Sequence, residues 1–212
     1  TGEGATSEGD FHEALNIASV WDLPVLFVIE NNGYGLSTPT NEQYRCENLA
    51  DKGVGYGMES HVVDGNNLLE VVHLISELKA SMVENPRPVL LEFKTFRMRG
   101  HEEASGTKYV PQELMDMWAI KDPVENYRNY LKATAVLSEE EDEAIRAEIK
   151  KEIDTDWAKV QEEPEIVASL EEELGDVYAP YTFEEFNPSS EIENIRVIDA
   201  ISNGLRQSME RH

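Results

Sequence analysis

The chain has 212 residues, of which 43 are acidic and 18 basic, so its formal net charge at pH 7 is −25. Such a negative field repels nucleic acid, and the single cysteine, Cys46, excludes a disulfide framework and a cysteine-clustered zinc site. No apolar run approaches the roughly 20 residues of a membrane span, so we expect a soluble, cytoplasmic protein that binds neither nucleic acid nor a membrane.

The first 133 residues alternate between helical and strand patterns. Residues 7–21 suit a helix, and the continuous apolar run 24–29 predicts a strand that is covered on both faces. A second helix is expected from about residue 67 to residue 83, and a second buried strand over 89–93. This alternation predicts an α/β fold over residues 1–133, with a mostly parallel sheet flanked by helices.

Acidic residues concentrate farther along the chain, where residues 138–178 carry 16 of them against four basic ones. The same stretch has an apolar stripe at helical spacing, made of Ile145, Ile149, Ile153, Trp157 and Val160. We therefore expect an acidic helical extension over 134–178, amphipathic with one narrow docking seam. A charged helix face of this kind is most often simply solvated.

The last part of the chain is expected to begin a new unit. Residues 179–193 contain Pro180, Pro188 and two adjacent serines, which is typical of a linker. Residues 194–212 then show a fresh amphipathic helical pattern.

The glycine-rich segment 2–7, Gly-Glu-Gly-Ala-Thr-Ser, stands at the expected start of the first helix. Its glycines let backbone N–H groups approach a ligand, and the helix dipole there favours phosphate. It is not a Walker loop, but it could pass for a dinucleotide fingerprint with Glu30 as the ribose-binding acid, or be a plain glycine turn. Because a strand normally precedes such a turn, we expect the chain to be part of a longer protein.

The segment 30–34, Glu-Asn-Asn-Gly-Tyr, follows the first expected strand. Ligands of open parallel sheets lie at the carboxyl ends of strands. The Glu3 carboxylate, the Asn32 amide oxygen and the Tyr34 carbonyl are hard oxygen donors that, with phosphate oxygens and a water, would suit Mg²⁺. Alone, Asn-Asn-Gly would be an ordinary turn. The 29 residues from Glu3 to Asn32 correspond to one helix plus one strand, so both motifs should reach the same sheet edge.

A third segment is basic in an otherwise acidic chain. Arg97, Arg99 and His101 follow Lys94 at the end of the second expected strand. They could neutralise a diphosphate or a 2-oxo carboxylate, or form a solvated basic loop.

Taken together, segment 2–10 and Asn32-Gly33-Tyr34 resemble the thiamine diphosphate signature of the alpha subunits of 2-oxo acid dehydrogenases. The resemblance continues through Asp122-Pro123 and the acidic stretch to Asp176-Val177-Tyr178. It implies that the fold is part of the thiamine diphosphate-binding fold. It also implies that Glu3, Asn32 and the Tyr34 carbonyl hold the metal, while Gly4 and Ala5 offer N–H groups to the diphosphate.

The loop that matches 97–101 borders the cofactor in this family. The resemblance therefore implies that Arg97 and His101 bind the cofactor, and that His101 is catalytic and assists transfer of the acyl group to a lipoyl group. Animal relatives have a regulatory serine directly after this histidine. Here that position is Glu102, so phosphorylation cannot occur there.

The implied activity is the oxidative decarboxylation of a 2-oxo acid, with transfer of the acyl group to a lipoyl-bearing acyltransferase. Glutamate at position 3, where many thiamine enzymes have aspartate, favours the branched-chain, 2-oxoisovalerate type. In this family the acid that activates the cofactor comes from the beta subunit. The helix over 194–212 resembles the start of that subunit, which suggests an alpha–beta fusion, truncated here at both ends; the alternative is a coincidental similarity of one amphipathic helix. We therefore expect a homo- or hetero-oligomer, and no activity from this chain alone.

Three alternatives stay open. The enzyme could be a pyruvate or acetoin dehydrogenase component, or a dinucleotide-binding oxidoreductase, or the chain could be an acidic docking module without enzymatic activity. Titration with thiamine diphosphate and Mg²⁺ against NAD distinguishes a thiamine diphosphate enzyme from a dinucleotide-binding oxidoreductase. The Asn31-Asn32 pair favours thiamine diphosphate. Loss of assembly with unchanged cofactor affinity, after deletion of the acidic helix, would favour the docking module.

Overall fold

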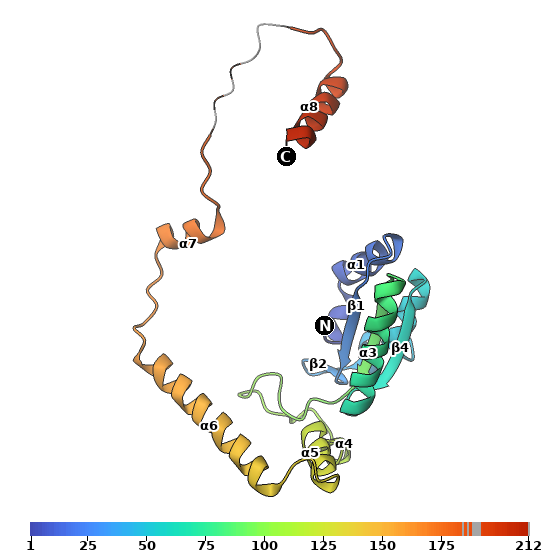
Figure 1. Ribbon diagram of the computed structural model, residues 1–212, viewed down its shortest axis with the longest axis vertical. Helices are drawn as coiled ribbons and strands as arrows, with labels where there is room; N and C mark the ends of the chain where they lie inside the picture. The colour runs from blue at the N-terminus through green and yellow to red at the C-terminus, as the bar shows by residue number, and fades with distance from the viewer. Residues whose placement is uncertain (184, 186, 188–191, 212) are drawn as a thin grey trace. The chain divides into compact units, whose positions relative to one another are not determined.

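The computed structural model describes residues 1–183, 185, 187 and 192–211 (Figure 1). The chain divides into two compact units, Thr1–Ile153 and Asp154–His212. No helix within the described residues is long and apolar enough to cross a lipid bilayer.

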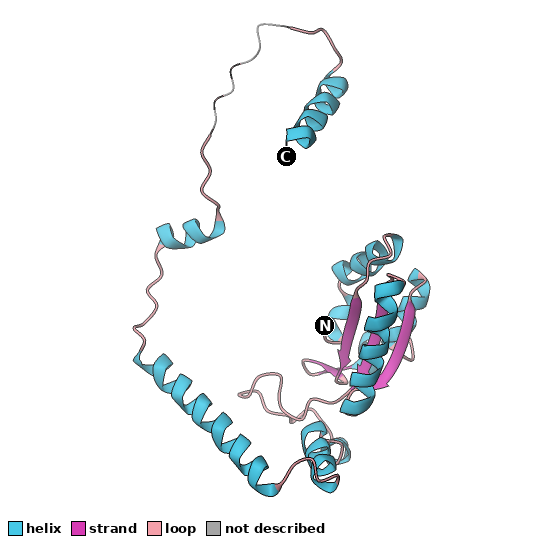
Figure 2. Cartoon of the chain, viewed as in Figure 1, coloured by secondary structure: helices cyan, strands magenta, loops and turns pink. Residues whose placement is uncertain are grey.

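The first unit is built on a three-stranded parallel sheet (Figure 2). Its strands, in spatial order, are β1 (Leu26–Asn31), β5 (Val89–Lys94) and β4 (Glu59–Asp64). Asn31 and Asp64 both pair with Lys94, so the three strands end together at one edge. Gly2 adds an isolated parallel bridge to Glu30, which brings the start of the chain to the same edge.

Helices cover both faces of this sheet. One face carries α1 (Gly9–Val20) and the 3-10 helix η2 (Leu49–Tyr56), and the other carries α3 (Leu68–Glu84), which lies in front of the strands in Figure 1. In the central strand Leu90 packs toward α1 and η2, whereas Val89 and Leu91 pack toward α3. The fully buried apolar run of β5 is therefore explained by a covered sheet.

Short elements complete the first unit. They are η1 (Gly4–Ser7), β2 (Tyr34–Gly35), β3 (Thr38–Pro39), α2 (Thr40–Gln43), α4 (Gln112–Ala119) and α5 (Pro123–Ala133). Strands β2 and β3 pair antiparallel in a small hairpin. Helix α5 is capped by Asp122, whose Oδ1 accepts hydrogen bonds from the amides of Val124 and Glu125, both at 2.9 Å.

The predicted α/β fold with a parallel sheet flanked by helices is confirmed. The first strand lies two residues farther along than the apolar run suggested, and the predicted first helix starts at Gly9, after η1. Besides the short elements β2, β3, α2 and the two 3-10 helices, the sequence did not predict β4, α4 and α5. Strand β4 has only two apolar residues, Val62 and Val63, which are adjacent and form no apolar run.

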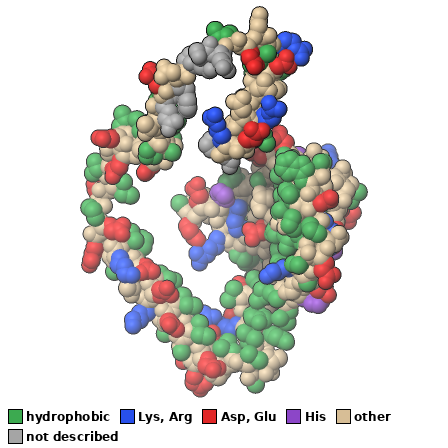
Figure 3. Space-filling view, turned by 45° about the horizontal axis from the view of Figure 1, so that its top comes forward, with side chains coloured by type: hydrophobic (Ala, Val, Ile, Leu, Met, Phe, Trp, Pro, Cys, Tyr) green, Lys and Arg blue, Asp and Glu red, His purple; other side chains and the backbone are tan. Residues whose placement is uncertain are grey.

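The acidic stretch forms two helices rather than the single one that its stripe indicated. They are α6 (Glu139–Glu162) and α7 (Leu170–Val177), and residues 164–169 between them form no helix. Pro164 lacks the amide hydrogen that a continuing helix needs, which accounts for the break. Acidic and apolar side chains occur together along α6 (Figure 3), and the stripe residues are all about half or more exposed.

Helix α6 is joined to α5 through one buried acid. Asp142 is 7% exposed and lies 2.7 Å from the Lys132 Nζ of α5 and 3.1 Å from the Arg146 Nε of its own helix. At the start of α6, the Ser138 Oγ accepts from the Glu141 amide, and the Glu141 Oε2 accepts from the Ser138 amide. This reciprocal capping box ends the preceding loop.

The second unit contains α7 and α8 (Val197–Arg211), the latter at the place where the new amphipathic helix was predicted. Part of the predicted linker, residues 184, 186 and 188–191, lies outside the described residues, as does His212. The linker residues that are described form neither helix nor strand.

Candidate functional site

Two loops that are far apart in the sequence meet at the carboxyl edge of the sheet. The Glu3 side chain is 1% exposed, and its Oε2 accepts a hydrogen bond of 3.0 Å from the Asn32 backbone amide. A carboxylate has about four lone-pair sites, so this bond leaves most of its accepting capacity free. The predicted convergence of the glycine-rich segment with the Asn-Asn-Gly turn is therefore present.

The Asn-Asn-Gly turn is held by its own side chains. The Asn31 Oδ1 accepts from the Gly33 amide and the Asn32 Oδ1 accepts from the Tyr34 amide, both at 3.2 Å. Gly33 has a φ of +88°, in the left-handed region that favours glycine. The Gly33 carbonyl accepts from the Thr40 amide at 3.1 Å, which ties the turn to the end of the β2–β3 hairpin.

The glycine-rich segment forms η1. The Thr6 hydroxyl, fully buried, donates to the Glu3 carbonyl at 2.7 Å, and the Lys52 Nζ donates to the Thr6 carbonyl at 2.7 Å. Burial lowers the pKa of Lys52. The amides of Gly4 and Ala5 open this helix, where N–H groups have no acceptor within the helix and are available to a ligand.

The basic loop reaches the same place through Arg97. Its Nη2 donates to the Leu36 carbonyl at 2.5 Å and to the Tyr109 hydroxyl at 3.0 Å, and its Nη1 lies 3.4 Å from the His101 Nδ1. A guanidinium only donates hydrogen bonds, so this contact assigns the acceptor role to Nδ1. In neutral His101 the proton is then on Nε2.

One open cavity of about 460 Å³ collects these groups. All seven residues predicted for the site line it, namely Glu3, Gly4, Ala5, Asn32, Tyr34, Arg97 and His101. The other lining residues are Gly2, Gly35, Leu36, Thr38 and Gln43. Glu30, the acid that a dinucleotide site would use, is exposed and is not among them.

The donor set of this cavity fits Mg²⁺ accompanied by a phosphate ligand. In the part of the chain that the structure describes, no group of three histidine, cysteine or acidic side chains could hold a metal ion. The Glu3 carboxylate is instead accompanied by neutral oxygen donors on Asn32 and Tyr34. Mg²⁺ is commonly bound through one or two carboxylates, with phosphate and water completing its octahedron.

Four polar residues beside this cavity were not predicted as a group. The Asn31 Nδ2 donates to the Glu92 Oε1 at 2.7 Å and to the Tyr44 hydroxyl at 3.0 Å, and the Lys94 Nζ lies 2.5 Å from the same Glu92 oxygen. Burial raises the pKa of the Tyr44 phenol. The one signal in the sequence is Glu92 itself, an acid within an apolar strand.

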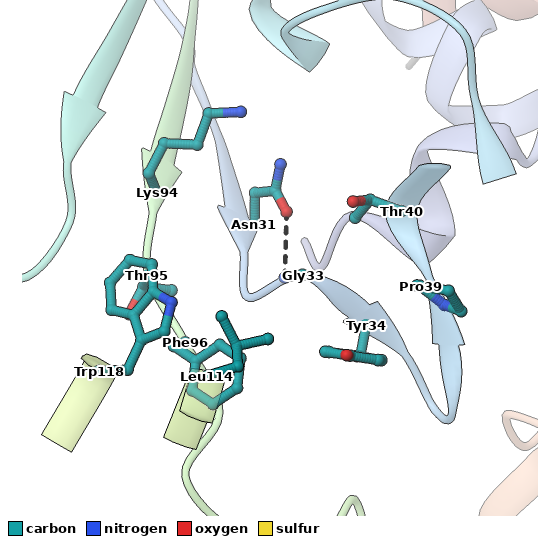
Figure 4. A pocket seen from close by; sticks show the side chains of 10 residues that line it. All are labelled: Asn31, Gly33, Tyr34, Pro39, Thr40, Lys94, Thr95, Phe96, Leu114 and Trp118. Atoms are coloured by element: carbon teal, nitrogen blue, oxygen red, sulfur yellow. Dashed lines mark hydrogen bonds between the residues drawn. The ribbon is translucent and has the colours of Figure 1, made fainter. Parts of the chain in front are cut away.

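A second, smaller cavity of about 330 Å³ shares Tyr34 with the first (Figure 4). Its apolar wall consists of Phe96, Leu114 and Trp118, with Phe96 and Trp118 stacked at 5.5 Å between ring centroids. Asn31 and Lys94 reach it from the ends of β1 and β5. The sequence predicted neither helix α4, which carries Leu114 and Trp118, nor this cavity.

Comparisons with known proteins identify the family. The family described as dehydrogenase E1 component matches residues 1–169. Similar proteins include 2-oxoisovalerate dehydrogenase subunit alpha 2 of Arabidopsis thaliana, 36% identical over 84% of this chain and 38% of that protein. The 3-methyl-2-oxobutanoate dehydrogenase subunit alpha of Mycobacterium tuberculosis is 39% identical over 70% of this chain and 41% of that protein.

The 2-oxoisovalerate dehydrogenase subunit alpha of Bacillus subtilis is 35% identical over 84% of this chain and 54% of its own length. A transketolase structure from Campylobacter jejuni, at 19% identity and a TM-score of 0.40, covers 57% of this chain and 20% of that one. The chain thus spans between about two fifths and about half of these alpha subunits. The family match covers most of the sequence, including every residue of the cavity, and the chain belongs to the dehydrogenase E1 component family.

Proposed function

We propose that this chain binds the diphosphate and Mg²⁺ of thiamine diphosphate in a 2-oxo acid dehydrogenase. The observation that carries the proposal is the buried Glu3 carboxylate, bonded to the Asn32 amide at the mouth of a cavity lined by further oxygen and N–H donors. The relatives named for 2-oxoisovalerate and 3-methyl-2-oxobutanoate favour a branched-chain 2-oxo acid as the substrate.

In this proposal the metal is held by the Glu3 carboxylate, the Asn32 amide oxygen and the Tyr34 carbonyl. The amides of Gly4 and Ala5 donate to the diphosphate. Thiamine diphosphate, when bound, supplies the electron sink that decarboxylation of a 2-oxo acid requires. The chain's own residues bind and orient that group. The positive end of η1 favours the negative diphosphate, and the negative Glu3 carboxylate favours the metal ion.

Arg97 and His101 serve the cofactor and the acyl transfer. Arg97 lies between the hairpin and the Tyr109 hydroxyl, with a guanidinium that suits phosphate oxygens. Because the His101 Nδ1 faces Arg97, its Nε2 carries the proton in the neutral ring and can donate a hydrogen bond to a phosphate oxygen at the cavity. We assign His101 to phosphate contact and to transfer of the acyl group to a lipoyl group.

The complete enzyme needs partners. We propose that a beta subunit, or a beta half of a fused chain, supplies the acid that activates the cofactor. A lipoyl-bearing acyltransferase then receives the acyl group. Residues 1–133 would be part of the diphosphate-binding domain, 134–178 an acidic extension, 179–193 a linker and 194–212 the first helix of the beta-like part. The enzyme would be a cytoplasmic homo- or hetero-oligomer.

The test is a calorimetric titration of the full-length protein with thiamine diphosphate, in the presence and absence of MgCl₂, and with NAD. We expect saturable binding of thiamine diphosphate that requires Mg²⁺, and no binding of NAD. Binding of NAD alone would overturn the proposal. Residues 1–212 without further chain should show no decarboxylation, and kcat/KM measured with branched-chain 2-oxo acids, pyruvate and acetoin on the assembled enzyme decides the substrate.

A further inference from the structure

A fully buried carboxylate lies under the candidate metal loop. Glu92 is 0% exposed and sits in the central strand, β5, opposite Ile29 of β1. Its Oε1 accepts from the Asn31 Nδ2 at 2.7 Å and lies 2.5 Å from the Lys94 Nζ, while its Oε2 accepts from the Ala50 amide at 2.9 Å. Each oxygen therefore has a donor, as a buried carboxylate requires.

Asn31 connects this carboxylate to the turn that carries Asn32 and Tyr34. It is the last residue of β1 and is 6% exposed. The nitrogen of its side-chain amide donates to Glu92. The oxygen accepts from the Gly33 amide at 3.2 Å, the contact drawn in Figure 4. Its backbone carbonyl accepts from the Thr95 amide at 2.9 Å, so the main chain is fixed by β5 as well.

Only one orientation of the Asn31 amide satisfies both Glu92 and the Gly33 amide, whereas its third partner, the Tyr44 hydroxyl, can either accept or donate. If the amide were turned over, its oxygen would face the Glu92 carboxylate and its NH₂ group would face the Gly33 N–H. Two acceptors would then oppose each other at one end and two donors at the other. The charge of Glu92 thus decides which end of Asn31 reaches the turn, and thereby holds the Gly33 amide.

A role in the packing of β5 alone would not need this connection. Lys94 and the Ala50 amide already provide Glu92 with a cation and a backbone donor within its own strand and η2. The contact with Asn31 adds a link to the loop at the carboxyl edge. Groups that orient metal ligands act in this way, and their removal typically lowers metal affinity by about 10- to 100-fold.

We propose that Glu92 is a positioning residue for the metal site, acting through Asn31 on the turn that presents Asn32 and the Tyr34 carbonyl. This inference rests on the proposed function. It predicts an effect on metal selectivity, since Mg²⁺ demands a nearly ideal octahedron whereas Ca²⁺ accepts a looser arrangement of oxygens. A turn that is no longer held should therefore lose Mg²⁺ affinity more than Ca²⁺ affinity.

The experiment compares four forms of the assembled full-length enzyme: wild type, Asn31→Asp, Glu92→Gln, and the double variant N31D/E92Q. Asn31→Asp places two carboxylates against each other, and Glu92→Gln removes the charge that orients Asn31. The double variant restores one hydrogen bond with donor and acceptor exchanged, while the glutamine oxygen can still accept from the Ala50 amide. Leu91→Val is the matched control, because Leu91 neighbours Glu92 in the strand but packs on the opposite face.

MgCl₂ and CaCl₂ are titrated in the presence of thiamine diphosphate, with tryptophan fluorescence as the signal, and thermal unfolding is recorded for each apo form. In Asn31→Asp we expect Mg²⁺ affinity to fall about tenfold or more, Ca²⁺ affinity to fall less, and the double variant to regain most of the Mg²⁺ preference. Leu91→Val should lower the unfolding temperature without changing that preference. Asn31→Ser, which introduces no charge, replaces Asn31→Asp if the latter does not fold.

The outcomes distinguish this inference from the proposed function. If the wild type shows no Mg²⁺-dependent binding of thiamine diphosphate, the proposed function fails and the inference fails with it. If the wild type binds and the Asn31 variants keep its ratio of Mg²⁺ to Ca²⁺ affinity, the inference alone is overturned. An equal change of that ratio in Leu91→Val would also overturn it, because the effect would then follow from stability.

Discussion

Substitutions of Glu3 distinguish two roles of its buried carboxylate, as a hydrogen-bond acceptor and as a metal ligand. In the apo protein its Oε2 accepts the hydrogen bond from the Asn32 amide at 3.0 Å. In the proposed holoenzyme the same side chain is the charged ligand of the metal. Glu3→Gln keeps an acceptor for the amide and removes the charge, whereas Glu3→Ala removes both. The two variants should therefore differ in stability and agree in metal binding.

The magnitudes follow from the burial of Glu3. Glu3→Gln exchanges a charge-assisted hydrogen bond for a neutral one, so the free energy of unfolding should fall by only about 1 kcal/mol. Glu3→Ala leaves a part-buried amide without its acceptor, and the loss should be about 1–3 kcal/mol, in addition to any cavity that forms. Both variants lose a direct metal ligand. Mg²⁺ affinity should therefore drop by at least about 100-fold, or about 2.8 kcal/mol.

Urea unfolding of the apo forms measures the change in the free energy of unfolding. Calorimetric titration of MgCl₂ in saturating thiamine diphosphate measures the change in Mg²⁺ affinity. Glu8→Gln is the control, because Glu8 is an exposed acid at the opposite end of the same short helix, η1. It should change neither quantity appreciably. Glu3→Gln with wild-type Mg²⁺ affinity would refute the assignment of Glu3 as a metal ligand. Equal stability of the two Glu3 variants would refute the argument from the Asn32 amide.

Three further substitutions test other parts of the chain. His101→Ala should weaken cofactor binding less than it slows acylation of a lipoyl substrate, and equal losses in the two assays would contradict its assigned role. Arg97→Lys keeps the positive charge but loses the guanidinium group that donates to the Tyr109 hydroxyl. Limited proteolysis of the loop after residue 97 should therefore be faster. An unchanged cleavage rate would contradict a role of Arg97 in holding that loop. Asp142→Asn should lower the unfolding temperature at neutral pH. The hydrogen bond from Lys132 holds the pKa of Asp142 below its ordinary 3.8, so the wild-type advantage should be full above about pH 4 and disappear as the pH falls through that lowered pKa; identical melting curves at neutral pH would contradict it.

The parts of the fold that could be predicted are those with a strong apolar pattern. Strands β1 and β5 are covered on both faces, so each appears in the sequence as an apolar run, and α3 shows its apolar face at helical spacing. Strand β4 gave no such signal. Val63 is 4% exposed but its neighbour Val62 is 45% exposed, so one face of this strand is largely uncovered. Its residues therefore resemble a loop when they are examined alone.

The site could be predicted where its residues are joined by a short and regular path. One helix and one strand separate Glu3 from Asn32, and a parallel sheet brings such positions to one edge. The contacts of Arg97 could not be found in this way. Its guanidinium is held by the Leu36 carbonyl and the Tyr109 hydroxyl, one on a hairpin and one in a long loop. No periodic pattern specifies where those two loops lie.

The role of Glu92 could be predicted only in part. The run Val-Leu-Leu-Glu-Phe predicts a strand buried on both faces, and the same burial makes an acid within it costly unless donors surround it. Within its own strand only Lys94 provides a donor, and the other donors come from neighbouring elements. With β1 beside β5 in parallel register, the side chain that β1 provides at the strand end is Asn31, directly before the candidate metal loop. An isolated acid in a buried strand is therefore a signal in the sequence. It indicates that a side chain from a neighbouring strand end bonds to the acid, and that the loop after that strand is fixed there.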